Sequence, residues 1–303
     1  MDEDCIIVGG GLAGLQAAIQ LGRYQHRVLV IDSGQGRSMI CKKYHNMLGW
    51  PDGVSGQELR TRGRRQAEEL GVRFVQGEVV HASREEDGLF VLNTVDHEAG
   101  ERTSYHGRRL LLATGVKDRI PSIEGLAACL GSSIYICPDC DGYEVRGKET
   151  LVIGSGDAGA SMAIVLSYWT PHLTYINHDR ASISLEQLAR LQQLGIARVD
   201  ASVSEVLHKE GEISAVRLAS GDMVEASHAF VAFGGNQVRT ELALMLGVEV
   251  MNNRHVAVDP RTKLTNQPHI WAAGDLVAHS EQAIIAMGDG SQAAIWIHKS
   301  LLG

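Results

Sequence analysis

The chain has few cysteines, few prolines and few aromatic residues. It contains 5 cysteines and 6 prolines among 303 residues, and 5% of its residues are aromatic. Five scattered cysteines exclude the disulfide framework of a small secreted domain, so two cysteines close together are more typical of redox chemistry or metal binding. The 34 glycines stand out against this background. Many glycines with few prolines indicate repeated tight turns against ligands rather than a disordered chain.

Long apolar runs and dense basic runs are also absent. No stretch approaches the ~20 apolar residues that a membrane-spanning helix needs. The first residues, Met-Asp-Glu-Asp, lack the basic start of a signal peptide. We therefore expect a cytoplasmic protein that does not bind a membrane. The net charge of −8 argues against nucleic acid as a partner. One cluster of arginines, Arg60, Arg62, Arg64 and Arg65, predicts an exposed helix face.

An internal repeat carries the strongest signal for the fold. Residues 7–32 and 152–177 align without a gap, and each reads as an apolar strand, a glycine turn, an alanine-rich helix and a second apolar strand. This is the βαβ unit of a nucleotide-binding fold. Residues 73–81 and 88–95, and later 203–232, alternate like antiparallel strands. The sequence therefore predicts an α/β protein with two Rossmann-like, three-layer β/β/α domains.

The glycines of the two repeats have defined physical roles. The first glycine of each turn permits the sharp bend, the second lets a pyrophosphate approach the backbone, and the third lets the helix pack against the strand. The helix N-terminus then offers free N–H groups to the phosphates. These glycines are Gly9, Gly11 and Gly14 in the first copy, and Gly154, Gly156 and Gly159 in the second. Asp32 ends the first unit and is suited to the ribose hydroxyls of a dinucleotide, whereas the second unit ends in Asn177.

Cys137 and Cys140 form a CxxC segment, CPDCDG. Two cysteines at this spacing can close a small disulfide at the start of a helix, where their environment tunes the thiolates. The competing interpretation is half of a zinc site, which would need further ligands. The remaining cysteines, Cys5, Cys41 and Cys129, are unpaired in sequence, so we expect no metal site and assign them to packing.

In combination, these motifs resemble those of the low-molecular-weight thioredoxin reductases over nearly the whole chain. The matching segments are GGGLAG with Asp32, His45-Asn46 before LGWPDG, Ala113-Thr114-Gly115, Cys137 to Gly142, GSGDAG, AAGD ending at Asp275, and Glu281-Gln282-Ala283. Their order and spacing are far more specific than any one of them.

The resemblance implies FAD as cofactor and assigns roles to residues. Gly9, Gly11, Gly14 and Asp32 would hold the ADP half of FAD, and Asp275, after Gly274, would bond the ribityl chain. The backbone N–H groups of Gln282 and Ala283 would face the N1–O2 edge of the flavin, while Asn46 and Thr114 would also lie in the cofactor site. Cys140 would face the flavin, Cys137 would exchange with the substrate disulfide, and Asp141 would act as the acid/base or as a helix cap.

The resemblance also implies a domain arrangement. Residues 1–117 and 249–303 would form a discontinuous FAD-binding domain, and residues 118–248 an NAD(P)-binding-like domain that carries the CxxC. Members of this family are homodimers in which the middle domain rotates, so Lys117 and Val248 mark expected hinges. The implied partner is a thioredoxin-like protein or a small dithiol or disulfide.

The sequence departs from the family at the second nucleotide site. NADPH-dependent members carry a His-Arg-Arg run with a later arginine, whereas this chain has Asn177, His178, Asp179 and Ile183. Each lost charge-assisted bond to the 2′-phosphate costs ~1–3 kcal/mol, so we predict that NADPH binds weakly. NADH could serve instead, or the site could be empty and a ferredoxin-type protein could supply electrons. Alternatively, a dithiol substrate could reduce the flavin and oxygen reoxidise it.

A second departure is the Pro138-Asp139 pair between the cysteines, because Asp139 disfavours nearby thiolates. Three functions therefore stay open: a reductase of a thioredoxin-like disulfide, a dithiol oxidase acting on a small-molecule product, and a slow-turnover flavoprotein redox sensor.

Overall fold

The computed structural model describes residues 2–95, 100 and 102–303. The chain divides into two compact units. The first comprises Met1–Met39, Ser55–Lys117 and Gln237–Gly303, and the second comprises Ile40–Val54 and Asp118–Asn236. This division differs from the expected domain limits at residues 40–54, which group with the second unit, and at residues 237–248, which group with the first. Which ligand each unit binds stays a prediction.

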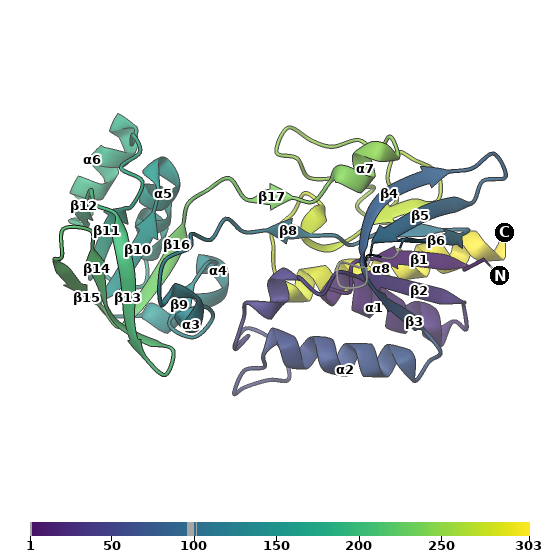
Figure 1. Ribbon diagram of the computed structural model, residues 1–303, viewed down its shortest axis with the longest axis horizontal. Coiled ribbons are helices and arrows are strands. Elements are labelled where there is room, and N and C mark those ends of the chain that lie inside the picture. Colours follow the sequence, from purple (N-terminus) through teal and green to yellow (C-terminus); the bar gives the residue numbers. More distant parts are fainter. Residues whose placement is uncertain (1, 96–99, 101) are drawn as a thin grey trace. The chain divides into compact units, whose positions relative to one another are not determined.

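The first unit is built on a five-stranded parallel sheet (Figure 1). Its strand order is β18-β7-β1-β2-β3, with bounds Ile270–Ala272, Leu110–Leu112, Cys5–Val8, Val28–Asp32 and Arg73–Gln76. A three-stranded antiparallel sheet accompanies it, formed by β4 (Glu78–Arg84), β5 (Phe90–Val95) and β6 (Arg102–Gly107). Two helices, α1 (Leu12–Arg23) and α8 (Ala283–Leu302), pack closely against each other.

Strand β1 shows how this unit forms three layers. All four of its residues are buried, as expected for a central strand of a sheet that is covered on both faces. Cys5 and Ile7 pack in a core with residues of α1 and α8. Ile6 and Val8 point the other way, into a core with residues of β4 and β5. The alternation of side chains along one strand therefore divides the core into a helical side and a β side.

The second unit repeats this plan. Its parallel sheet has the order β12-β11-β10-β16-β9, with bounds Ala197–Val199, Leu173–Asn177, Thr150–Gly154, His228–Ala232 and Ile134–Tyr135. On one face, Val152 and Tyr175 pack with helices α5 (Gly156–Leu166) and α6 (Leu185–Gln193). On the other face, Leu151 and Ile153 pack with the antiparallel sheet β13 (Val203–Lys209), β14 (Glu212–Leu218) and β15 (Met223–Glu225).

The remaining elements are short, apart from α2. In the first unit they are η1 (Arg37–Met39), α2 (Gly56–Glu68), β8 (Val116–Lys117), β17 (Gln237–Val238), α7 (Glu241–Met245) and η3 (Gly274–Leu276). In the second unit they are α3 (Leu126–Cys129), α4 (Pro138–Asp141) and η2 (Gly142–Val145). Strands β8 and β17 pair antiparallel. Within the described ranges, no helix is both long and apolar enough to cross a membrane.

The predicted fold class, α/β with two Rossmann-like β/β/α units, is confirmed. The prediction of one strand over residues 73–81 was wrong, because the chain changes sheets there. Residues 73–76 form β3, which pairs parallel with β2, and residues 78–84 form β4, which pairs antiparallel with β5. Alternating polarity does not distinguish these two kinds of pairing. The last helix, α8, begins at Ala283.

Candidate active site

Cys137 and Cys140 form a disulfide at the start of α4, with their Cα atoms 5.3 Å apart. Cys137 is the N-cap residue, and its carbonyl oxygen accepts the N–H of Asp141 at 3.0 Å. Pro138 occupies the first turn, where a helix needs no N–H donor. Both cysteines are partly exposed. The predicted redox pair is therefore assembled on one short helix.

Asp141 follows the disulfide directly and is largely buried. Burial raises the pKa of its carboxyl to about 7, and the negative charge of Glu144 contributes. The Asp141 side chain does not cap the turn that begins beside it, η2. Within the described part of the chain, the carboxyl has no hydrogen-bond or ion-pair partner. A carboxylic acid that titrates near neutral pH beside two sulfurs is suited to proton transfer.

Glu144 is fixed by a histidine from a distant part of the sequence. Its Oε1 atom lies 2.9 Å from Nδ1 of His45. The same loop is anchored a second time, because the N–H of Lys42 donates to the carbonyl oxygen of Gly131 at 3.3 Å. Nothing in the sequence spacing relates His45 to Glu144, so this pair could not be predicted from the sequence.

The other three cysteines are poor nucleophiles. Burial raises the pKa of the Cys41 thiol to about 12, with a further contribution from Asp141. Burial also raises the pKa of Cys5 and of Cys129. Across residues 2–95, 100 and 102–303, no group of three or more His, Cys, Asp and Glu side chains is arranged to hold a metal ion.

The first glycine turn has the shape of a phosphate cradle. Gly9 has φ of +107°, and a Cβ atom there would lie 2.3 Å from the carbonyl oxygen of Ala113. A Cβ on Gly14 would lie 1.9 Å from the carbonyl oxygen of Gly9. In contrast, a Cβ on Gly11 would have no atom within 4 Å, and α1 begins there without a side-chain cap. The helix therefore presents uncapped N–H groups to an open space, which fits a pyrophosphate.

Asp32 lies beside this turn, where it accepts the N–H of Gly10 at 3.0 Å. Its second oxygen lies 2.5 Å from Nη2 of Arg60. Nη1 of Arg60 and Oγ of Ser38 are buried without a partner in the described part of the chain. These polar atoms are available to a ribose or phosphate group, which also fits FAD.

The predicted exposed helix face was therefore wrong for Arg60, whose side chain is only 12% exposed. The other three arginines of α2 are exposed and pair with glutamates on their own helix: Arg62 with Glu58, Arg64 with Glu68, and Arg65 with Glu69. Helical spacing alone could not identify which arginine faces Asp32.

Asp275 lies in η3 and contacts Arg37, a residue that the sequence analysis did not select. The distance from Arg37 Nη1 to Asp275 Oδ2 is 3.2 Å, and Arg37 also pairs with Glu281. Burial raises the pKa of Asp275, and Arg37 opposes that shift. Gln282 is the N-cap of α8 and has no side-chain hydrogen bond at the cap, so Ala283 begins a helix with open N–H groups.

Two further predicted cofactor residues have other surroundings. The Thr114 hydroxyl donates to the carbonyl oxygen of Arg239 at 2.7 Å. Asn46 is exposed and belongs to the second unit, with the cysteine pair, while the glycine turn, Asp32 and Asp275 belong to the first. The roles assigned to all these residues toward FAD stay predictions.

The second glycine turn follows β10, and the residue at its ribose position is Asn177. The hydrogen-bonding groups of the Asn177 side chain are already taken by other groups of the protein. Asn177 is 2% exposed. Its Oδ1 atom accepts the N–H of Gly156 at 3.0 Å, and its Nδ2 atom donates to Ala181 O and to Asp200 Oδ1. Of the flanking glycines, Gly154 ends β10 and Gly159 faces the Tyr175 ring. Asn177 therefore has no hydrogen-bonding group left for a ribose.

The residues that follow Asn177 are also occupied. Nδ1 of His178 accepts the N–H of Val203 at 3.0 Å. Asp179 pairs with Arg119, with Oδ2 and Nη2 3.4 Å apart. Arg119 is a cation near this turn that the sequence analysis did not identify, and its charge is shared with Asp179.

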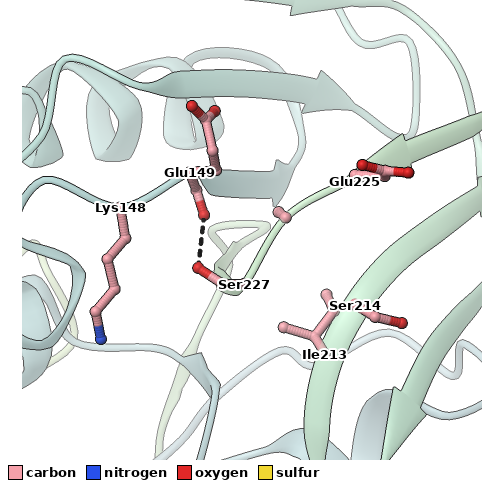
Figure 2. A pocket seen from close by; sticks show the side chains of 7 residues that line it. Lys148, Glu149, Ile213, Ser214, Glu225 and Ser227 are labelled. Atoms are coloured by element: carbon pink, nitrogen blue, oxygen red, sulfur yellow. Dashed lines mark hydrogen bonds between the residues drawn. The ribbon is translucent and has the colours of Figure 1, made fainter.

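A pocket of about 410 Å³ lies elsewhere in the second unit (Figure 2). Its lining includes Lys148, Glu149, Ser214, Glu225 and Ser227. Figure 2 shows the hydroxyl of Ser227 directed at the carbonyl oxygen of Glu149, 3.3 Å away. None of the predicted site residues lines this pocket, so it does not belong to the disulfide site.

Comparison with known proteins identifies the family. A family model described as pyridine nucleotide-disulphide oxidoreductase matches residues 3–290. This chain belongs to that family. Thioredoxin reductase of Mycolicibacterium smegmatis is 30% identical, with 97% of this chain and 94% of the relative covered. Thioredoxin reductase of Treponema pallidum is 31% identical, with 97% and 95% covered. The crystal structure of HlmI matches with a TM-score of 0.87 and 28% identity, over 99% of this chain and 93% of that one.

The resemblance to thioredoxin reductases is thereby confirmed, and the protein is a flavoprotein disulfide oxidoreductase of the pyridine nucleotide-disulphide oxidoreductase family. Membership of this family implies FAD. The first unit of this oxidoreductase offers a glycine cradle, an uncapped helix and unpartnered polar atoms that fit that cofactor.

Proposed function

We propose that this oxidoreductase passes electrons between FAD and the Cys137–Cys140 pair, and on to a thioredoxin-like disulfide, with a donor other than NADPH. One observation carries the proposal: the disulfide lies directly before a buried carboxyl with a pKa of about 7. Reducing a disulfide to two thiols takes two electrons and two protons. Asp141 would supply or accept one of those protons at neutral pH.

The residues of the first unit would bind and orient the cofactor. The N–H groups at Gly11 and the start of α1 would hold the pyrophosphate, and Asp32, with Arg60 beside it, would hold the adenosine ribose. Asp275 would bond the ribityl chain, and the N–H groups at Gln282 and Ala283 would face the flavin edge. When bound, FAD supplies two-electron redox chemistry.

The state of the second glycine turn supports a donor other than NADPH. The Asn177 side chain is buried and has no hydrogen-bonding group left for a ligand. His178 bonds to the backbone N–H of Val203. Asp179 adds a carboxylate where a phosphate would bind. Arg119 offsets part of that charge but is already paired. NADH or a ferredoxin-type protein would then supply electrons to the flavin.

The same observation favours a second candidate, a dithiol oxidase. If no dinucleotide enters, electrons can come from a small-molecule dithiol through Cys137 and Cys140, with oxygen as the acceptor. Each turnover would convert two thiols to a disulfide and O₂ to hydrogen peroxide. A cytoplasmic homodimer is expected for either function.

Anaerobic reduction of the FAD-loaded protein tests the donor. We expect NADPH at micromolar concentration to leave the flavin oxidised, and NADH, a reduced ferredoxin or a dithiol to bleach it. Rapid bleaching by NADPH would overturn this part of the proposal.

Cys137→Ser and Cys140→Ser should each abolish turnover in a thioredoxin–insulin assay and in dithiol-dependent oxygen uptake. Unchanged turnover in either variant would overturn the disulfide chemistry.

A further inference from the structure

Asp289 holds together three segments of the first unit. Its Oδ2 atom lies 2.6 Å from Nε2 of His279 and accepts the backbone N–H of Gly274 at 3.3 Å. Its Oδ1 atom lies 2.7 Å from Nζ of Lys263. Asp289 lies on α8, and it was not among the predicted site residues, nor were His279 and Lys263. The three side chains form a cluster that the redox pair does not use.

The cluster is buried and carries one positive charge in excess. The side chains of Asp289, Lys263 and His279 are 7%, 11% and 19% exposed. Nδ1 of His279 lies 2.8 Å from the carbonyl oxygen of Ser280, and Nε2 contacts the Asp289 carboxylate. Because both partners are acceptors, both ring nitrogens must carry a hydrogen, which makes the ring an imidazolium. Two cations therefore share one carboxylate.

The electrostatics agree with this protonation state. The hydrogen bond to Asp289 raises the pKa of His279 above its usual value, against the opposing effects of burial and of Lys263. Burial alone would raise the pKa of Asp289, but the bonds from His279 and Lys263 outweigh it and lower that pKa. Both shifts favour the ionised carboxylate and the protonated imidazole.

The cluster borders the loop that would contact the flavin. His279 lies between Asp275, the expected ribityl ligand, and Gln282, the residue before the open N–H groups of α8. Burial raises the pKa of Asp275, and the charges of Arg37 and His279 oppose that rise. Arg37 pairs with both Asp275 and Glu281, and Nε2 of His255 lies 3.4 Å from Oε1 of Glu281. Arg37 offsets one of these two carboxylates, and the raised pKa of Asp275 favours its neutral form.

We propose that His279 and Lys263, held by Asp289, place a fixed positive charge at the pyrimidine edge of the flavin. This inference rests on the proposed function, because it takes the flavin edge to lie at Gln282 and Ala283. Two electrons and one proton added to a flavin leave one negative charge on its N1–C2=O edge. A nearby cation stabilises that charge and so makes the cofactor a stronger oxidant of dithiols. His279 is a positioning residue in this scheme, since it acts through its charge.

Sulfite binding to the FAD-loaded protein is the test. Sulfite binds reversibly to oxidised flavin and leaves a negative charge on the same edge, so its Kd reports the local field without any turnover. We expect His279→Gln to weaken sulfite binding by roughly tenfold, the effect of removing one unit charge from a partly buried site. The midpoint potential of the flavin should fall in the same variant, while its FAD content stays unchanged.

His298→Gln is the matched control. His298 lies on the same helix, but its ring bonds to His26 and stacks on Tyr24. We expect sulfite affinity within twofold of wild type there. Equal sulfite affinities in His279→Gln and His298→Gln would overturn the proposal, as would a wild-type affinity no higher than that of free FAD.

Lys263→Gln provides an independent variant if His279→Gln does not fold, and it should weaken sulfite binding in the same direction. An unchanged affinity in Lys263→Gln would count against the proposal. Sulfite binding does not need the cysteines, so the two proposals can fail separately. Normal turnover of Cys137→Ser would overturn the disulfide chemistry alone. A chain that takes up no flavin would overturn both.

Discussion

Nδ1 of His45 lies 2.9 Å from Oε1 of Glu144, and this contact ties the loop of residues 40–54 to the turn that follows the disulfide. Glu144 in turn acts on Asp141, whose pKa it helps to raise to about 7 after the larger effect of burial. A proton at Asp141 near neutral pH therefore depends on a glutamate that a histidine from another part of the chain holds in place.

Glu144→Gln should make Asp141 a stronger acid. Removing the negative charge lowers the cost of ionising Asp141, so its pKa falls. If the protonated form serves turnover, the basic limb of the pH–rate profile should move to lower pH by about half a pH unit or more. The pH dependence of turnover with a small disulfide or dithiol measures this shift.

Glu149→Gln is the matched control for this variant, since Glu149 is an exposed glutamate that does not contribute to the pKa of Asp141. Its pH profile should coincide with that of the wild type. A profile for Glu144→Gln that also coincides would show that the Glu144 charge does not act on the reacting proton.

Gly14→Ala and Gly11→Ala should separate folding from cofactor binding. A Cβ at Gly14 would lie 1.9 Å from the carbonyl oxygen of Gly9, so the helix must move away, at a cost of about 3 kcal/mol or more in stability. A Cβ at Gly11 meets no protein atom within 4 Å, so the fold should tolerate it, but the methyl group would enter the space expected for the pyrophosphate. Thermal unfolding and FAD content together measure both effects. Normal FAD content in Gly11→Ala would contradict the assignment of this turn.

The repeat at residues 7–32 and 152–177 made the overall fold predictable, because the βαβ pattern depends on local glycine spacing and apolar periodicity. The disulfide was equally local, since Cys137 and Cys140 are three residues apart. Side chains that meet across long sequence separations could not be found in this way. Arg60 reaches Asp32, and Arg37 reaches Asp275, only because the chain folds.

The burial and charged neighbours of a side chain were the second feature that could not be predicted from the sequence. Asp289 reads in the sequence as an ordinary helical aspartate, yet its side chain is 7% exposed and contacts Lys263 and His279. In the sequence, Asn177 stands only as the counterpart of Asp32 at the end of the second repeat. Its saturation by Gly156, Ala181 and Asp200 required the three-dimensional structure.

Asp179→Arg should improve reduction by NADPH. The change replaces a carboxylate by a guanidinium at a position where the resemblance implies a phosphate-binding arginine, and it frees Arg119 from its ion pair. We expect the apparent NADPH affinity to rise by roughly tenfold, the effect of one new charge-assisted bond. Stopped-flow flavin reduction measures the change. Asp179→Asn removes the repulsion without adding a cation, so an equal gain in both variants would show that the new arginine makes no bond to NADPH.

The His279–Asp289 contact should also make stability depend on pH in a defined direction. The folded-state pKa of His279 is raised, so its charged form stabilises the fold fully below its unfolded pKa, and this contribution is lost as pH rises through the folded value. Asp289 has a lowered pKa, so its contribution to stability is present above its unfolded pKa and is lost only in acid.

The His279→Gln variant should therefore be less stable than wild type by about 1–2 kcal/mol near pH 6, and this difference should shrink as pH rises. Denaturant unfolding at several pH values, with His298→Gln in parallel, measures the difference. A stability gap that stays constant from pH 6 to pH 9 would mean that the imidazolium makes no net contribution to stability.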